Sequence, residues 1–264
     1  MVRRIDFLGA PGIGKTTLYK ALLKGKLPAN FISEKDAGRR ALENYVKRQP
    51  LDKRLSFRVL HAIPKLRKYY ASNMEYECQR QVHREFMKHH EAFYRAAADC
   101  LSEAGRSVGR MAGGFHSFIK KNMRWSVIHK HFNDQNTMIL SDESLSHRIF
   151  LLLPWAEKSV DMAALYYWHL PAPDGLVYVT SDADTVQARI IERKEIARKF
   201  IPGHKNLDES ELKARIEGTL ELARVGASVL EDRGVPVLKL NGGDAVQSNV
   251  LKIQTYIGNF SFES

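Results

Sequence analysis

The chain has 264 residues, of which 44% are hydrophobic and 27% charged, and its formal net charge is +11. This apolar content is ample for a globular core. Its two cysteines, Cys78 and Cys100, have no Cys-x-x-Cys spacing, which argues against a disulfide scaffold or a zinc site and favours a reducing cytoplasm. The longest apolar run after the N-terminus, residues 149–155, is far too short to span a membrane, so we expect a soluble cytoplasmic protein without a transmembrane segment.

The positive charge is concentrated in one central segment. Residues 39–131 contain 20 Lys and Arg against 8 Asp and Glu, a net charge of +12, so the rest of the chain is nearly neutral. Two interpretations stay open. The segment is either a solvated helical surface or a surface that attracts an anionic partner.

A complete phosphate-binding loop follows a strand candidate at residues 5–8. Gly9, Gly14, Lys15 and Thr16 fill the pattern Gly-x4-Gly-Lys-Ser/Thr. Glycines let the loop turn its backbone N–H groups toward a polyphosphate, and the helix that follows adds its positive end. Lys15 would contact the β- and γ-phosphates, and the Thr16 hydroxyl would bind Mg²⁺. We therefore predict that ATP or GTP binds through the whole loop, which comprises Gly9, Ala10, Pro11, Gly12, Ile13, Gly14, Lys15, Thr16 and Thr17.

Strand and helix candidates then alternate along most of the chain. Further strands are expected at residues 30–34, 137–141, 175–180 and 235–240, and helices at 17–23, 183–199, 208–231 and from 246 onward. Residues 39–133 are almost wholly helical in pattern, with one long helix over 75–103, a break at Gly113–Gly114 and a helix over 117–132. The alternation predicts an α/β fold, with a parallel sheet of about five strands that is flanked by helices.

Apolar periodicity predicts which side chains of these helices are buried. In 75–103 the expected core positions are Cys78, Val82, Phe86, Phe93, Ala97 and Leu101. Trp125, Trp155 and Trp168 are expected in the core, and the histidines on the surface or in packing positions, because they show no metal-ligand spacing.

Acidic side chains stand at the ends of two expected strands. Glu34 and Asp36 follow one, and Asp142 and Glu143 the other. Because ligands bind at the carboxyl ends of parallel strands, these side chains should share a rim with the phosphate loop and residues 241–244. Asp142 is a candidate Mg²⁺ ligand, and the other three are candidate bases or acceptor-binding groups. For Asp36, helix capping is an equal alternative.

A basic helix follows the strand at 175–180. Arg189 and Arg193 lie one turn apart on one face, and a Pro-Gly turn comes after them. Residues 189–206 could close over a triphosphate as a lid and neutralise charge on the transferring group. The alternative is a solvated helix in which Glu192 and Glu195 pair with the cations.

Several strings resemble the thymidylate kinase and deoxyribonucleoside kinase branch of P-loop kinases. The similar segments are the phosphate loop, the string Met138–Asp142, the segment from Pro173 through Arg189 and Arg193, and the final strand with its Asn-Gly-Gly turn and helix. The resemblance implies a single P-loop kinase domain over 1–264, a helical acceptor-binding insertion at 39–135, and adenine contacts near Gly242 and Gly243. Glu143 stands where that family has an arginine, a contact that Arg148 could supply instead.

These observations predict an ATP- and Mg²⁺-dependent kinase. The candidate catalytic residues are Lys15, Asp142, Glu143, Glu34, Arg189 and Arg193, and the metal ligands are Thr16 and Asp142. The acceptor would be a hydroxyl or phosphate of a nucleoside, nucleotide, sugar or glycan, and the basic segment favours anionic acceptors. The alternatives are a P-loop ATPase or switch that binds nucleic acid or another polyanion, and a protein of the membrane surface. The sequence has no aromatic-interleaved nucleic-acid motif, which argues against the first alternative. It does not determine the oligomeric state, and a homodimer is one possibility.

Overall fold

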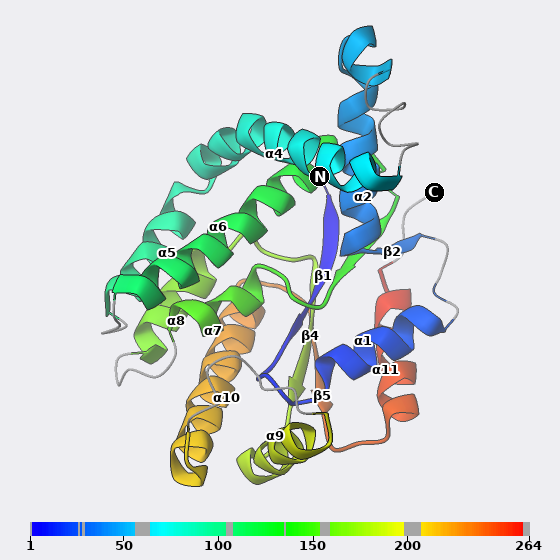
Figure 1. The fold of residues 1–264 in the computed structure, drawn as a ribbon. Coiled ribbons are helices and arrows are strands. Elements are labelled where there is room, and N and C mark those ends of the chain that lie inside the picture. The colour runs from blue at the N-terminus through cyan, green and yellow to red at the C-terminus, as the bar shows by residue number, and fades with distance from the viewer. Residues whose placement is uncertain are drawn as a thin grey trace.

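The computed structural model describes residues 2–25, 27, 30–55, 64–103, 108–134, 136–153, 159–197 and 207–260. Within them, five strands form one all-parallel sheet in the order β2-β3-β1-β4-β5 (Figure 1). The strands are β1 Arg3–Leu8, β2 Phe31–Ser33, β3 Met138–Ser141, β4 Gly175–Thr180 and β5 Val237–Asn241. The predicted α/β fold with five parallel strands is therefore confirmed, with β1 at its centre.

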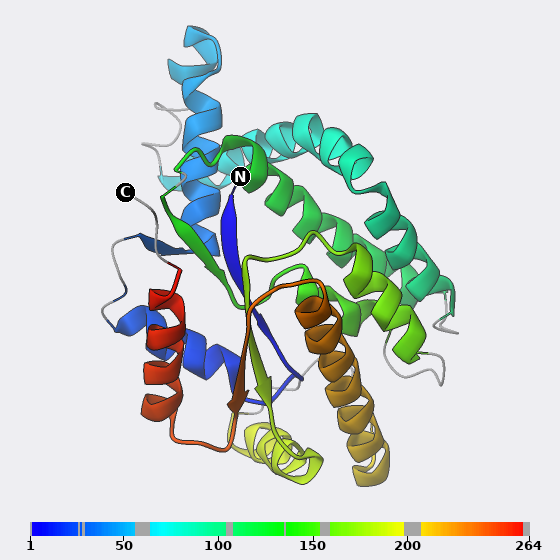
Figure 2. The same ribbon diagram turned by 180° about the vertical axis from the view of Figure 1, so that it is seen from behind.

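Helices cover both faces of this sheet, as the two opposite views show (Figures 1 and 2). They are α1 Lys15–Lys24, α2 Glu34–Lys47, α4 Pro64–His89, α5 Glu91–Glu103, α6 Val108–His131, α7 Ile149–Leu152, α8 Ser159–His169, α9 Ala183–Ala197, α10 Glu209–Asp232 and α11 Val246–Gly258, with a 3₁₀ turn, η1, at Ser146–Arg148. Helices α2, α4, α5 and α6 lie between β2 and β3 in the sequence. In the described part of the chain, every helix is too short or too polar to cross a membrane.

Alternation along β1 assigns its side chains to two different cores. Ile5 and Phe7 pack with residues of α1 and α11, such as Leu22 and Ile253. Leu8 points to the opposite face and joins the larger cluster formed by α2, α4 to α8 and α10. This period of two is what a strand buried between two helical layers requires.

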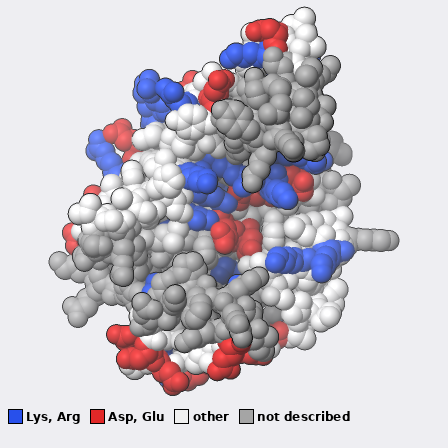
Figure 3. Space-filling model, viewed as in Figure 1, with Lys and Arg blue, Asp and Glu red and all other residues white. Residues whose placement is uncertain are grey.

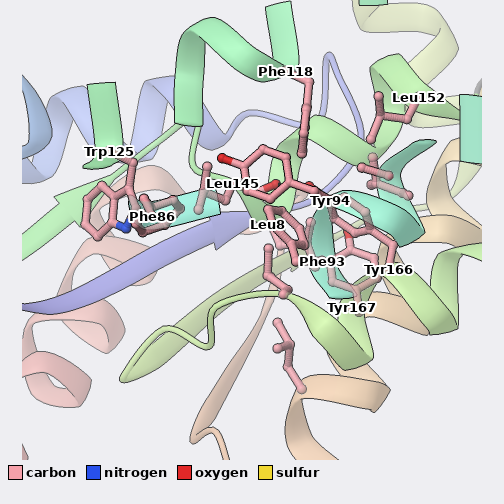
Figure 4. Packing of buried hydrophobic residues seen from close by; sticks show 14 of the residues in the cluster. Leu8, Phe86, Phe93, Tyr94, Phe118, Trp125, Leu145, Leu152, Tyr166 and Tyr167 are labelled. Atoms are coloured by element: carbon pink, nitrogen blue, oxygen red, sulfur yellow. The ribbon is translucent and has the colours of Figure 1, made fainter. Parts of the chain in front are cut away.

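Aromatic rings fill the larger core where these helices converge over the end of β1 (Figure 4). The Phe93 ring lies 5.5 Å from that of Phe118 and 5.0 Å from that of Tyr166, measured between centroids. Tyr167 packs against α10 so closely that a Cβ at Gly226 would lie 2.3 Å from its ring. This cluster attaches the helices between β2 and β3 firmly to the sheet.

Two expectations about the central helices are wrong in detail. The long helix expected over 75–103 is divided at His90 into α4 and α5, although its six expected core residues are all buried. The break expected at Gly113–Gly114 does not occur, since α6 runs through both glycines. Two glycines cost a helix roughly 2 kcal/mol relative to alanine, and the packing of Phe118, Trp125 and Ile128 further along α6 outweighs that cost.

The tryptophans divide similarly. Trp125 is buried, as expected, whereas Trp168 is 58% exposed, so its expected core position is wrong. Trp155 lies outside the described residues.

Candidate active site

The phosphate-binding loop connects the central strand β1 to α1 at the carboxyl edge of the sheet. Gly9, Gly12 and Gly14 have φ angles of 152°, 90° and 108°, which side chains rarely adopt. A Cβ at Gly9 would also lie 2.4 Å from the Val179 carbonyl oxygen. Gly14 is the N-cap of α1, and no side chain caps the helix, so its N-terminal N–H groups are available to an anion.

Lys15 is folded back over this loop. Its Nζ donates to the carbonyl oxygens of Gly9 at 2.6 Å and Ala10 at 2.8 Å, and the residue is only 6% exposed. Burial lowers the pKa of Lys15 to about 8, against the charges of Asp142 and Glu143, which act to raise it. The ammonium group is thus poorly solvated and lies near two carboxylates. Its position over the loop is where a bound phosphate would lie.

Asp142 and Thr16 form a pair of oxygen donors beside the loop. Their side chains are hydrogen-bonded to each other, and burial raises the pKa of Asp142 while Thr16 and Lys15 oppose the rise. Its Oδ1 is buried and has no hydrogen-bond partner in the described structure. A buried carboxylate oxygen without a partner, next to a hydroxyl, fits a Mg²⁺ ion, which typically takes one or two protein oxygens together with substrate phosphates.

Glu34 lies at the start of α2 and accepts three hydrogen bonds from two side chains. Lys121 on α6 donates to its Oε1 at 2.6 Å and its Oε2 at 2.8 Å, and Ser141 also donates to Oε2. Burial acts to raise the pKa of Glu34, but the Lys121 charge and these hydrogen bonds outweigh it and lower the pKa. Glu34 is therefore a buried, ion-paired carboxylate, which makes it a weak proton acceptor.

Glu143 differs from Glu34 in being largely open to solvent. Its side chain is 65% exposed and accepts from Arg148 Nη2 at 3.1 Å. The Arg148 side chain is only 11% exposed, and its Nε is buried without a partner in the described structure. Arg148 is thus paired with Glu143, and its contact with an acceptor stays a prediction.

His147 belongs to the site, although the sequence indicated a surface or packing role for the histidines. It lines the same cavity as Lys15 and Asp142, and its Nδ1 is buried without a partner among the described residues. Burial, followed by the charges of Lys15, Arg148 and Lys121, holds the pKa of His147 well below its usual value, so its imidazole is neutral at pH 7. The only signal in the sequence was its position five residues after Asp142.

These groups surround one cavity of about 490 Å³ at the carboxyl edge of the sheet. It is lined by Pro11, Gly12, Gly14, Lys15, Thr16, Thr17, Asp142, Glu143, His147, Arg189, Ile190 and Arg193. Figure 3 shows acidic and basic side chains next to each other near the centre of the face seen in Figure 1. The structure therefore brings together all the predicted catalytic residues except Glu34, which accepts a hydrogen bond from Ser141 and is not part of the lining.

Arg189 ties the basic helix α9 to two loops. Its Nη1 donates to the Ile13 carbonyl oxygen at 3.2 Å and its Nη2 to that of Gly242 at 3.0 Å. A Cβ at Gly242 would lie 2.6 Å from the Ile13 carbonyl oxygen, so this position needs a glycine. Arg193 is exposed at the cavity rim, and residues 198–206 of the expected lid lie outside the described residues.

Two other predicted positions take local roles. Asp36 pairs with Ser33, whose hydroxyl accepts from the Asp36 N–H and caps α2, so Asp36 belongs to a helix cap. Gly243 lies in the turn after β5, where its N–H donates to Asn241 Oδ1 at 2.8 Å.

A buried polar network holds the turn that carries His147 and Arg148. Asp6 on β1 accepts from Ser146 Oγ at 2.9 Å and from Arg4 Nε at 3.1 Å. The hydroxyls of Tyr166 and Tyr167 donate to the carbonyl oxygens of Leu145 at 2.6 Å and Ser146 at 2.9 Å. The turn is thus fixed to the central strand and to α8, which positions His147 at the cavity.

A parallel five-stranded sheet with a phosphate-binding loop after its central strand defines an α/β protein with the P-loop kinase type of fold. No protein-family model and no curated protein matches the sequence. Among solved structures, the chain is similar to shikimate kinase from Bacteroides thetaiotaomicron, with 16% identity and a TM-score of 0.37 over 97% of this chain and 98% of that one. The thymidylate kinase branch stays a prediction.

Proposed function

We propose that this protein is an ATP- and Mg²⁺-dependent small-molecule kinase, with the whole chain as one P-loop kinase domain. The observation that carries the proposal is the single cavity at which the phosphate loop, the Thr16–Asp142 pair and the arginines of α9 converge. Phosphoryl transfer needs positioning and positive charge more than covalent chemistry, and this lining supplies both.

On the donor side, the loop N–H groups and Lys15 would hold the phosphates of ATP. To do so, Lys15 exchanges its contacts with the Gly9 and Ala10 carbonyl oxygens for phosphate oxygens. Thr16 and Asp142 would hold Mg²⁺, which when bound neutralises charge on the β- and γ-phosphates. Arg189 and Arg193 would face the transferring group, and the Arg189 contacts to Ile13 and Gly242 keep the adenine-side turn next to the loop.

On the acceptor side, we assign the proton-accepting role to Glu143. It lines the cavity, whereas Glu34 has its two oxygens occupied by Lys121 and Ser141. Glu34 instead fixes the Lys121 ammonium close to Asp142, where its charge opposes the rise in the pKa of Asp142 that burial causes. His147 has a neutral ring and an Nδ1 without a partner in the described structure. It would accept a hydrogen bond from the bound acceptor or donate one to it.

The acceptor itself would carry an anionic group. Three cations gather beside Glu34. Lys121 is paired with Glu34, and the charges of Arg124 and Arg148 both act to lower the pKa of Lys121. Among the described residues, the Arg124 guanidinium makes no hydrogen bond or ion pair, and it lies over Gly38, whose added Cβ would be 3.5 Å from its Nε. We therefore propose residues 39–135 as the acceptor lobe, with a carboxylate or phosphate of the acceptor paired to these cations.

The test is a coupled ADP-release assay with nucleosides, nucleoside monophosphates, sugars and sugar phosphates, and mass spectrometry of the product. Lys15→Ala should abolish acceptor-dependent ADP release, whereas Lys24→Ala, an exposed lysine on the same helix, should leave it unchanged. Arg124→Gln should raise KM for the anionic acceptor, and Lys120→Gln should not. Full activity of Lys15→Ala would refute the mechanism.

A different pattern would favour the other class of function. ADP release without a phosphorylated product, stimulated by DNA or RNA and steeply reduced by salt, would identify a P-loop ATPase that acts on a polyanion. The kinase proposal requires the opposite, a phosphorylated small molecule and no stimulation by nucleic acid.

A further inference from the structure

A second cavity of about 530 Å³ lies at the other edge of the sheet. It is lined by residues at the start of β1, by α4 and the junction that follows it, by α6, and by the segment before β4. The lining residues are Val2, Arg4, Val82, Glu85, Phe86, His89, His90, Trp125, Ser126, His129, Lys130, Pro171 and Ala172. None of these residues lines the phosphate-loop cavity. Arg4 precedes Gly9 by five residues of an extended strand, or about 16 Å, so the two cavities lie at opposite ends of β1.

The inner wall of this cavity is apolar and aromatic. Phe86 and Trp125 are 5% and 4% exposed, and the Arg4 guanidinium lies 4.7 Å from the centroid of the Trp125 ring. Arg4 itself is fixed by Asp6 and by the Pro171 carbonyl oxygen. A flat apolar body would therefore find a preformed surface, in a volume typical of small-molecule sites.

The rim of the cavity is polar and rich in imidazoles. Lys130 pairs with Glu85 at 3.0 Å, and the Arg4 guanidinium is paired with Asp6, which is not part of the lining. Three imidazoles, from His89, His90 and His129, complete the rim, and the Phe86 ring lies 4.4 Å from that of His90. Burial, and then the neighbouring imidazoles and Arg4, lower the pKa of His90, which favours its neutral form.

We infer that this cavity is a second ligand site, distinct from the phosphate loop, for a small organic anion with a flat apolar or aromatic body. The aromatic wall would take the body, and the imidazoles with Lys130 would take the carboxylate, sulfonate or phosphate. The inference does not depend on the proposed kinase activity.

The probe is anilinonaphthalene sulfonate, an aromatic anion whose fluorescence rises in apolar surroundings, and its uncharged counterpart phenylnaphthylamine. The double variant His129→Gln/Lys130→Gln removes an imidazole and a cation from the rim. His116→Gln/Lys120→Gln makes the same changes at exposed positions of the same helix, outside the lining. We expect saturable binding of one anion per chain, unaffected by saturating ATP and Mg²⁺. We expect Kd to rise about tenfold in the rim variant and to stay unchanged in the matched control.

Three outcomes would overturn the inference. They are equal binding by the rim variant and the control variant, equal affinity for the uncharged counterpart, or displacement of the probe by ATP. A thermal-unfolding scan of both variants shows whether each is folded. If the rim variant is unfolded, His90→Gln, compared with His116→Gln, replaces it in the same titration.

Discussion

Replacing Lys121 by methionine should destabilise the fold, because it leaves Glu34 as a buried carboxylate without its counter-ion. The side chains of the pair are 14% and 9% exposed, and the ammonium contacts both carboxylate oxygens. Breaking a buried pair from one side costs about 3–5 kcal/mol. Because the Ser141 hydroxyl and the Arg124 charge remain near Glu34, we expect the lower end, about 3 kcal/mol.

The chain offers a matched control on the same helix. Lys130 pairs with Glu85 at 3.0 Å, but the two side chains are 55% and 60% exposed. Lys130→Met should therefore cost less than about 1 kcal/mol. The double variant Glu34→Gln/Lys121→Met removes the uncompensated charge and should regain at least about half of the loss.

The assay is urea unfolding at pH 7 followed by circular dichroism, with the midpoints compared at unchanged slope. Two results would refute the reasoning. Equal losses for Lys121→Met and Lys130→Met would mean that burial does not set the value of the pair. A double variant no more stable than Lys121→Met would mean that the lost lysine packing, and not the unpaired Glu34 charge, causes the destabilisation.

Three further predictions concern the phosphate-loop site and Glu34. Since the pKa of Lys15 is about 8, its charge is lost as the pH rises through 8, so ATP affinity should fall between pH 7 and 9 by calorimetry, and Lys15→Arg should bind with a flatter pH profile. Gly242→Ala places a Cβ 2.6 Å from the Ile13 carbonyl oxygen and should cost about 1–3 kcal/mol in urea unfolding, whereas Gly218→Ala, in open space on α10, should stabilise by about 0.5–1 kcal/mol. Because the pKa of Glu34 is lowered on folding, its contribution to stability is present above its unfolded pKa and is lost as the pH falls through its folded pKa, so Glu34→Gln should weaken the acid dependence of the urea midpoint.

The parts of the site that the sequence predicted are those encoded locally. The loop from Gly9 to Thr17 needs only neighbouring glycines, one lysine and one threonine, and the structure has it in the expected place between β1 and α1. Asp142 could be placed because it ends a strand that alternation makes parallel to β1. The strand bounds agree within two residues for the same reason, since apolar runs and turn residues mark both ends.

The parts that could not be predicted depend on distant residues. Glu34 looked like a free candidate base, but it is paired with Lys121, which is 87 residues away and reaches it only because α6 packs on α2. His147 is neutral and faces the cavity because η1 is anchored by Asp6 and by two tyrosines of α8. No local pattern records either arrangement, since each follows from how the helices between the strands pack.

The central strand joins these observations. Its alternation gives Ile5 and Phe7 to the apolar core beneath α1 and α11, and turns Arg4 and Asp6 toward the helices on the other face. A buried ion pair is a poor source of stability, because removing two charges from water offsets most of their attraction. What Arg4 and Asp6 do provide is position: Asp6 fixes the turn that presents His147 to the phosphate-loop cavity, and Arg4 forms the wall of the second cavity against Trp125. Each end of the strand therefore serves one cavity, and a single buried polar chain connects them.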